Sequence, residues 1–140
     1  MHQSRADLRR LTPERRARLV AEIGDDAAGE WLLAARDAQL PPPDLDFCWL
    51  FCGGRGTGKS KSLSGAVHTA VRAGIKRMNF IAPTTADFHD VNLEGASGIM
   101  ATCGHDPPTR WVASHRRLEW SNGARLRFYT AEEPEIAARA

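Results

Sequence analysis

The chain has 140 residues, 42% of them hydrophobic, and a formal net charge of +2 at pH 7. This length suits one domain with its own core, or one incomplete domain, and is too short for two well-packed ones. Its composition shows no apolar run near the ~20 residues of a membrane span, no secretory signal pattern and no global excess of charge that indicates a polyanion partner.

Three cysteines, an odd number, in a chain without an export signal indicate reduced thiols in a cytoplasm. Two of them, Cys48 and Cys52, fall on one face of a predicted strand and are expected to be small core residues. Cys103 has no partner at metal-ligand spacing, so a zinc site is not expected.

Residues 1–43 are expected to form a helical lead that ends in a proline-rich linker. The sequence Thr-Pro-Glu at residues 12–14 supplies an N-cap, a proline at the first helical position and an acid in the first turn, which predicts a helix to about residue 23. A second helix is predicted over residues 27–37, with three side chains facing inward: Trp31, Leu32 and Ala35. The prolines at residues 41–43 then stop the helix and form an extended linker.

Gln39 lies just ahead of the next predicted strand. Because its amide both donates and accepts hydrogen bonds, it can read the edge of an adenine ring. The alternative is a polar linker residue.

Residues 44–140 are expected to form one incomplete domain built around a glycine-rich loop. The apolar run Phe47–Cys52 predicts a strand buried on both faces of a parallel sheet. Residues 53–60, Gly-Gly-Arg-Gly-Thr-Gly-Lys-Ser, fit the phosphate-binding (Walker A) pattern of glycine, four residues, then Gly-Lys-Ser. Apolar residues then recur at the spacing of one helix face: Leu63, Ala66, Val67, Ala70 and Val71.

A loop between a strand and a helix can hold phosphate groups by its backbone. The glycines allow a tight turn with inward-pointing amides, and the following helix adds its unpaired N-terminal amides. Lys59 would reach the β- and γ-phosphates of ATP, and the Ser60 hydroxyl would bind Mg²⁺. The predicted nucleotide-binding residues of the loop are Gly53, Gly54, Arg55, Gly56, Thr57, Gly58, Lys59 and Ser60. The alternative is a glycine-rich turn without a ligand.

The middle of the chain predicts one more strand and one more helix. Gly74 closes the helix after the loop, and Arg77 to Ala82 reads as the next parallel strand. After Pro83, Thr84 or Thr85 can cap a helix that runs to Leu93, before glycines interrupt it. Its polar residues are read as a solvated face and not as a metal cluster: Asp87, His89, Asp90 and Glu94. His68 and His105 have no evident catalytic partner.

Polar and apolar residues alternate from Arg117 to Tyr129 around an Asn-Gly turn, which predicts a hairpin. A two-residue turn would mix the two faces. A three-residue loop with Gly123 in the left-handed conformation opposes Leu118 to Leu126 and Glu119 to Arg125. We expect this second register because it keeps one face apolar.

Arginines crowd both ends of the chain. Six lie near the amino end (Arg5, Arg9, Arg10, Arg15, Arg16 and Arg18) and five near the carboxyl end (Arg110, Arg116, Arg117, Arg125 and Arg127). Each cluster fits a nucleic-acid surface or an ordinary solvated face.

Several further short sequence elements lie before and after the loop. They are Trp31 with Ala35-Arg36 and Gln39-Leu40-Pro41-Pro42; Ala82-Pro83-Thr84 with Ala86-Asp87; Glu94-Gly95-Ala96-Ser97-Gly98; Ser114-His115-Arg116-Arg117-Leu118 with Trp120 and Asn122-Gly123-Ala124; and Ala131-Glu132-Glu133-Pro134. From Trp31 to Pro134, the chain resembles the amino-terminal ATPase part of the large terminase subunit of tailed bacteriophages and gene-transfer agents. That protein is the motor that packages DNA into a procapsid.

The resemblance implies an α/β P-loop NTPase fold of the RecA-like class, with a partial parallel sheet and an appended antiparallel hairpin. It implies that Arg55 is the cis-acting arginine of the loop and that Gln39 reads adenine. It further implies ATP and Mg²⁺ as ligands, double-stranded DNA, a small terminase subunit and a portal protein as partners, and a homo-oligomer in the assembled motor. The expected location is the cytoplasm of a bacterial host, away from the membrane.

The family continues past the Glu-Pro element into an acidic Walker B strand and a nuclease domain, whereas this sequence stops at Ala140. Arg127 and Thr130 interrupt the nearest candidate strand, so Glu132 and Glu133 are expected to precede Walker B and not to be the catalytic acid. The 140 residues alone are therefore expected to hydrolyse ATP poorly. The alternatives are another P-loop class, such as a helicase-like or kinase domain, and a remnant that binds nucleotide without turnover.

Overall fold

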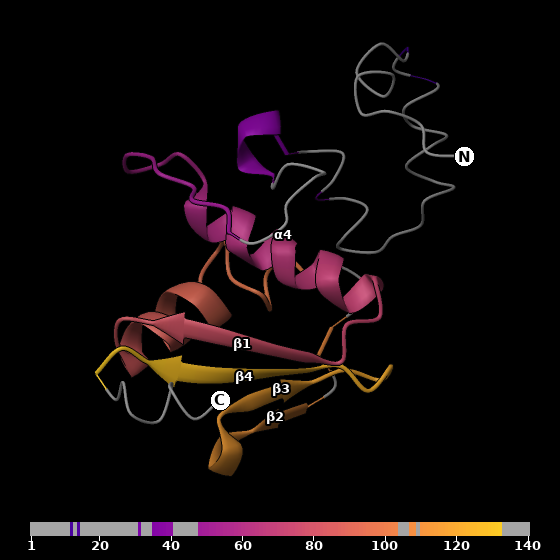
Figure 1. Cartoon of the computed structure of the whole chain (residues 1–140), viewed down its shortest axis with the longest axis vertical. Helices are drawn as coiled ribbons and strands as arrows, with labels where there is room; N and C mark the ends of the chain where they lie inside the picture. Colours follow the sequence, from indigo (N-terminus) through magenta and orange to yellow (C-terminus); the bar gives the residue numbers. More distant parts are fainter. Residues whose placement is uncertain are drawn as a thin grey trace.

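The computed structural model describes residues 12, 14, 31, 35–40, 48–103, 107–108 and 110–132. These residues form an α/β arrangement in which a four-stranded mixed sheet carries the helix α4 on one side (Figure 1). The elements are η1 (Asp37–Gln39), α4 (Lys59–Arg72), β1 (Arg77–Ala82), η2 (Asp87–Leu93), β2 (Arg110–Val112), η3 (Ala113–His115), β3 (Arg117–Glu119) and β4 (Arg125–Thr130). Among the helices of these described ranges, none has the length and apolar character needed to cross a membrane.

The strand order of the sheet is β1-β4-β3-β2. β1 runs parallel to β4, with Phe80 opposite Phe128, and the pairs β4–β3 and β3–β2 are antiparallel. The strand predicted at residues 77–82 is therefore confirmed. Its parallel partner is β4, and not the run at residues 47–52 that the sequence suggested. The sheet is mixed because β3 and β2 follow on the far side of β4 in antiparallel pairs.

The predicted hairpin register is confirmed. Leu118 lies opposite Leu126, and Glu119 lies opposite Arg125. The Trp120 amide donates to the Ala124 carbonyl at 3.0 Å, and the turn closes through Gly123, whose φ of 85° lies in the left-handed region. Residues with a side chain rarely adopt that conformation, which explains the glycine at this position.

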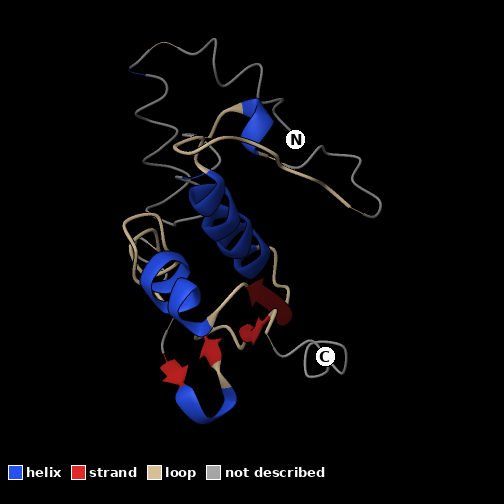
Figure 2. Ribbon diagram, turned by 90° about the vertical axis from the view of Figure 1, so that its left-hand side faces the viewer, coloured by secondary structure: helices blue, strands red, loops and turns tan. Residues whose placement is uncertain are grey.

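Side chains from α4, η2 and the sheet meet in one apolar core. Figure 2 views the strands nearly end-on and shows α4 and η2 on the same side of the sheet. Phe88 of η2 is fully buried, and its ring stacks on Phe128 of β4 with centroids 3.8 Å apart. The remaining core residues are Val67, Val71, Phe80, Ala82, Leu93, Ile99, Leu118, Trp120, Ala124 and Leu126.

The strand predicted over residues 47–52 is wrong. Residues 48–52 form no strand, and residue 47 lies outside the described residues. Leu50 is 81% exposed, and Cys48 and Cys52 are exposed, so they are not the core residues expected from the sequence. A strand forms only where its backbone groups pair with a neighbour. None of the four described strands pairs with this run, and apolar composition alone does not supply that partner.

The helix expected after the glycine-rich loop begins at Lys59, directly after Gly58, and ends at Arg72, shortly before Gly74. Its predicted buried face is only partly correct. Val67 and Val71 are buried, whereas Leu63 is 44% exposed and Ala66 is exposed. Polar contacts with the segment after η2 bury other positions instead: Ser64 Oγ donates to the Ser97 carbonyl at 2.8 Å, and His68 Nε2 lies 3.0 Å from Thr102 Oγ1.

The helix predicted after Pro83 is present as η2, which is wound as a π-helix. Thr84 caps it, because its Oγ1 accepts a hydrogen bond from the Asp87 amide at 3.0 Å. The same hydroxyl donates to the Asp87 carboxylate at 2.9 Å, so Thr84 and Asp87 fix the start of η2 reciprocally.

Trp31 and Ala35 are buried, as predicted for the amino-terminal segment. The other expectations, for residues 13, 15–30, 32–34 and 41–47, including Leu32 and the prolines, lie outside the described residues. The indole ring of Trp31 lies against Gly65 of α4, where an added Cβ would stand 2.4 Å from three ring atoms. The amino-terminal segment is thus packed onto the helix that follows the loop.

We expect Gly65→Val to destabilise the fold by about 1–3 kcal/mol, because the new side chain must displace the Trp31 ring from a close-packed contact. Ala66→Val is the matched control, since Ala66 is exposed on the same helix. Chemical denaturation of the two variants measures the difference. Equal free energies of unfolding would show that Trp31 does not pack on Gly65 in solution.

Candidate functional site

The glycine-rich loop folds into a turn that leads directly into the first turn of α4. Gly56 and Gly58 have φ values of 79° and 87°, both in the left-handed region. Gly58 also approaches Gln39 so closely that an added Cβ would lie 2.4 Å from Gln39 Nε2. These two glycines allow the helix to begin inside the loop, where the first amides of a helix have no intrahelical acceptor. Those amides favour an anion at this end of α4.

Side-chain hydrogen bonds hold the loop in shape. Lys59 Nζ donates to the carbonyls of Gly53 and Gly54, each at 2.7 Å. Thr57 Oγ1 donates to the same Gly54 carbonyl at 2.9 Å. The ammonium group of Lys59 is therefore held over the start of the loop.

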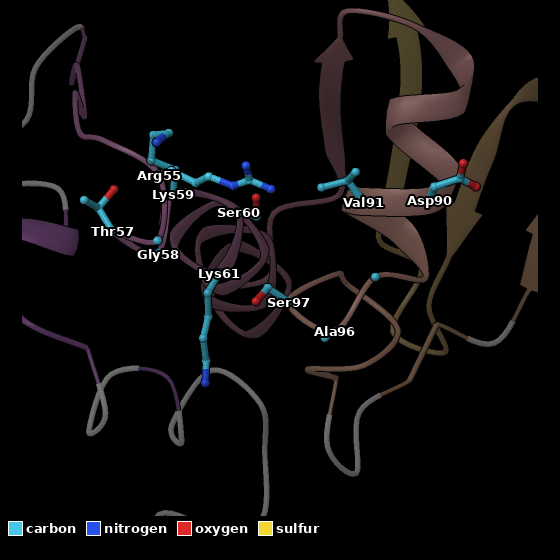
Figure 3. A pocket seen from close by; sticks show the side chains of 12 residues that line it. Arg55, Thr57, Gly58, Lys59, Ser60, Lys61, Asp90, Val91, Ala96 and Ser97 are labelled. Atoms are coloured by element: carbon cyan, nitrogen blue, oxygen red, sulfur yellow. The ribbon is translucent and has the colours of Figure 1, made fainter.

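The loop forms one wall of a cavity of about 490 Å³. This volume lies within the range of small-ligand sites, roughly 300–1,000 Å³. The opposite wall comes from η2 and the segment that follows it, including Asp90 and Ser97. Figure 3 shows Arg55 extending from the loop across the cavity toward Val91 and Asp90.

Cationic groups outnumber anionic ones among the residues that line this cavity. The cationic groups are Arg55, Lys59 and Lys61, and Asp90 is the one carboxylate in the lining. Arg55 and Lys59, together with the hydroxyls of Thr57 and Ser60, form a set of donors suited to phosphate oxygens, whereas the Lys61 side chain points away from them (Figure 3).

A second contact holds the loop from the amino-terminal side. Arg36 and Gln39 both donate to the Thr57 carbonyl, from Nη2 at 2.9 Å and Nε2 at 3.1 Å. Gln39 Oε1 in turn accepts from the Arg36 amide at 2.9 Å. Both ends of the buried Gln39 amide are therefore bonded to protein groups in this structure.

The structure brings together most of the loop residues singled out from the sequence. Six line the cavity: Arg55, Gly56, Thr57, Gly58, Lys59 and Ser60. Gly53 and Gly54 bind Lys59 through their carbonyls, and Gln39 contacts the loop without being part of the cavity lining. Recognition of adenine by Gln39 remains a prediction. To hydrogen-bond a base, the Gln39 amide must give up these contacts with Arg36 and Thr57.

Sequence reasoning missed one residue at this site. Arg36 had no assigned role, yet it bonds the loop carbonyl of Thr57. The available signal was its place within the short sequence elements around the loop, because hydrophobic periodicity says nothing about which polar side chains meet. Asp90, assigned to a solvated helix face, is exposed as predicted, and it also lines the cavity opposite the loop.

The next question is which of the described residues could bind a magnesium ion at this site. Among them, no three side chains of the His, Cys, Asp and Glu types lie close enough together to hold a metal ion by themselves. Mg²⁺ usually binds one or two protein ligands, phosphate oxygens and water. Ser60 lines the cavity and fits that ligand type, whereas the Asp90 carboxylate points away from the loop (Figure 3). Glu132 follows β4 and does not line the cavity, and Glu133 lies outside the described residues.

In comparisons with known proteins, the chain matches no family model, no curated protein and no solved structure. The loop, the cavity and the order of the sequence elements are therefore the features that indicate a function for this chain.

Proposed function

We propose that residues 53–60 bind the triphosphate of ATP together with Mg²⁺, and that the chain is the ATPase part of a DNA-packaging terminase large subunit. The observation that carries the nucleotide proposal is the junction of loop and helix. Two glycines in the left-handed region lead into α4, and Lys59 and Arg55 line one cavity at that junction. This combination of helix amides and cations suits a polyanionic ligand.

Each side chain of the loop has a distinct role in the proposal. Lys59 exchanges its two loop carbonyls for phosphate oxygens and provides a compact positive charge. Ser60 offers its hydroxyl to the metal ion. When bound, Mg²⁺ neutralises charge on the phosphate oxygens. Arg55 reaches across the cavity and stabilises charge that develops on the transferred phosphoryl group.

The terminase assignment is supported by which segments gather around the loop. The resemblance includes the elements at residues 35–36, 39–42 and 94–98, which are distant from the loop in sequence. Arg36 and Gln39 bind the Thr57 carbonyl, and Gly95, Ala96 and Ser97 line the cavity. A chance match to the loop pattern alone gives no reason for these segments to meet there.

The coding sequence that follows these 140 residues tests this assignment. We expect an acidic strand and then a group of nuclease carboxylates in the same reading frame, with portal or capsid genes nearby. A frame that continues into helicase or kinase motifs would replace the packaging role by one of those classes, while the proposed nucleotide site would stand.

We expect Arg55→Ala to leave the affinity for Mg-ATP nearly unchanged and to slow phosphate release by about 10³-fold, because an arginine of this type acts on the transition state. Turnover by the 140 residues is expected to be slow, so a single-turnover assay with protein in excess over ATP is the suitable measurement. Arg72→Ala at the far end of α4 is the control. Weaker binding with an unchanged rate would assign Arg55 to ground-state binding instead.

A further inference from the structure

The side of the sheet that faces away from α4 carries a concentration of arginines. Residues paired across neighbouring strands point to the same face, so the register arranges the side chains in rows. One row is Arg77, Arg125, Glu119 and Arg110, and the next is Asn79, Arg127, Arg117 and Val112. We call the surface formed by Arg77, Arg110, Arg117, Arg125 and Arg127 the arginine face. The alternate residues of these strands, such as Phe80, Leu126 and Leu118, point into the core.

The charge on the arginine face is far from balanced. Five guanidinium groups and one carboxylate give these two rows a net charge of +4. Glu119 Oε1 lies 2.7 Å from Arg117 Nη2 and 3.7 Å from Arg125 Nε, so the single carboxylate is shared between two arginines.

Like charges lie directly opposite each other at two positions of this face. Arg77 pairs with Arg125 across β1 and β4, and Arg117 pairs with Arg127 across β3 and β4. Directly opposed like charges destabilise a sheet, and a purely solvated face ordinarily mixes both signs. A fold that keeps two such pairs has a repulsion that a bound polyanion relieves.

The chemistry of the face selects among polyanions. Guanidinium groups bind phosphate oxygens in a bidentate manner, and all five cations of the face are arginines. The backbone positions of these arginines lie about 4.8 Å apart on neighbouring strands and about 6.7 Å apart along a strand, so the sheet brings the phosphate-binding groups close together. Single-stranded nucleic acids are ordinarily held by bases stacked on exposed aromatic rings. Tyr129, the aromatic residue in the row beyond Arg127, is only 5% exposed, with Arg127 Cζ 5.3 Å from its ring centroid. Its ring is therefore not open to a stacking base, which favours a duplex over a single strand.

We propose that the arginine face binds the phosphate backbone of double-stranded DNA. The surface itself follows from strand register and charge, and only the choice of DNA as the duplex rests on the proposed function. Because phosphate contacts carry the interaction, binding is independent of base sequence and weakens steeply with salt. The DNA surface and the phosphate-loop cavity involve different residues, so each binding event can be measured separately.

Fluorescence anisotropy with a labelled duplex, measured over a series of salt concentrations, tests the proposal on the whole chain. The informative variant is the double substitution Arg77→Gln and Arg127→Gln, which leaves in place the ion pairs of Glu119 with Arg117 and Arg125. Each lost phosphate contact lowers the slope of log K against log[salt] by about 0.9, so the double variant should lose roughly 2 units of slope and bind roughly 50-fold more weakly at 0.1 M salt. The double substitution of Arg77 and Arg127 by lysine keeps the charge and should keep the slope.

Arg72→Gln is the control. It removes one positive charge from an exposed position of α4, on the opposite side of the sheet, and should change the affinity for the duplex by less than about twofold. Thermal melting of every variant checks that it is folded. A wild-type slope near zero, an equal loss in the Arg72 variant, or tighter binding to single-stranded DNA or polyglutamate than to the duplex would overturn the proposal. Titration with Mg-ATP reports the proposed nucleotide site independently, since its failure would leave the DNA result unaffected.

Discussion

Replacing Lys59 by alanine is expected to raise the dissociation constant of Mg-ATP by about 100-fold while the protein stays folded. A hydrogen bond to a charged group contributes about 1.5–3 kcal/mol, and each 1.4 kcal/mol is a factor of ten in affinity. The side chain is exposed, and within the part of the chain that the structure describes its hydrogen bonds go to the Gly53 and Gly54 carbonyls, so the loss in stability should stay below about 1 kcal/mol. Isothermal titration calorimetry and thermal melting together measure both effects.

Lys61→Ala is the matched control for this substitution. Lys61 has the same charge and lies two residues further along the same helix, so its side chain leaves α4 about 200° away from Lys59. Figure 3 shows the two lysines pointing in different directions. We expect no more than about a threefold change in affinity for Lys61→Ala. Equal affinities of the Lys59 variant and the wild type would refute the assignment of the loop as the phosphate site.

Replacing Phe88 by alanine is expected to have the largest effect on stability, about 3–5 kcal/mol. Phe88 is fully buried, its ring stacks on Phe128, and its edge contacts Phe80 with centroids 5.6 Å apart. Removing the ring leaves a cavity between η2 and the sheet. Since domains of this kind are stable by only 5–15 kcal/mol, the variant should unfold at a far lower denaturant concentration.

Val91→Ala provides the comparison for Phe88→Ala, because Val91 belongs to the same η2 segment but is 45% exposed. Its expected loss is below about 1 kcal/mol. Urea unfolding of the two variants followed by circular dichroism separates the cases. Similar midpoints for both would contradict the packing of η2 onto the sheet.

Local signals in the sequence predicted the parts of the fold that short-range contacts determine. The hairpin follows from alternation and an Asn-Gly turn, and the chosen register places Leu118 opposite Leu126. The helix start at Lys59 follows from the glycine that precedes it. In each case one short segment contains all the information needed.

Predictions that depended on distant partners were less accurate. The run at residues 47–52 has the composition of a buried strand, yet no described strand pairs with it. The buried face of α4 was misjudged because contacts of Ser64 with Ser97 and of His68 with Thr102 bury polar positions. Tertiary hydrogen bonds of this kind leave no periodic pattern in the sequence.

The candidate site, like the fold, was predicted only where its residues are contiguous in the sequence. The loop residues were identifiable because the motif is contiguous. The second wall of the cavity, including Asp90, and the contact of Arg36 with the loop are set by how η2 and the amino-terminal segment pack. Asp90 is exposed, as a solvated helix face predicts, but its place in the cavity lining could not be inferred because a carboxylate on a helix gives no indication of the element that it faces.

The most direct measurement of the central claim is a calorimetric titration of the wild-type chain with Mg-ATP, Mg-ADP, AMP and inorganic triphosphate. If the loop and the first turn of α4 hold phosphates, affinity should fall in the order ATP, ADP, AMP, and triphosphate alone should compete with ATP for one site. Equal affinities for ATP and AMP, or no competition by triphosphate, would show that residues 53–60 are not a phosphate-binding loop.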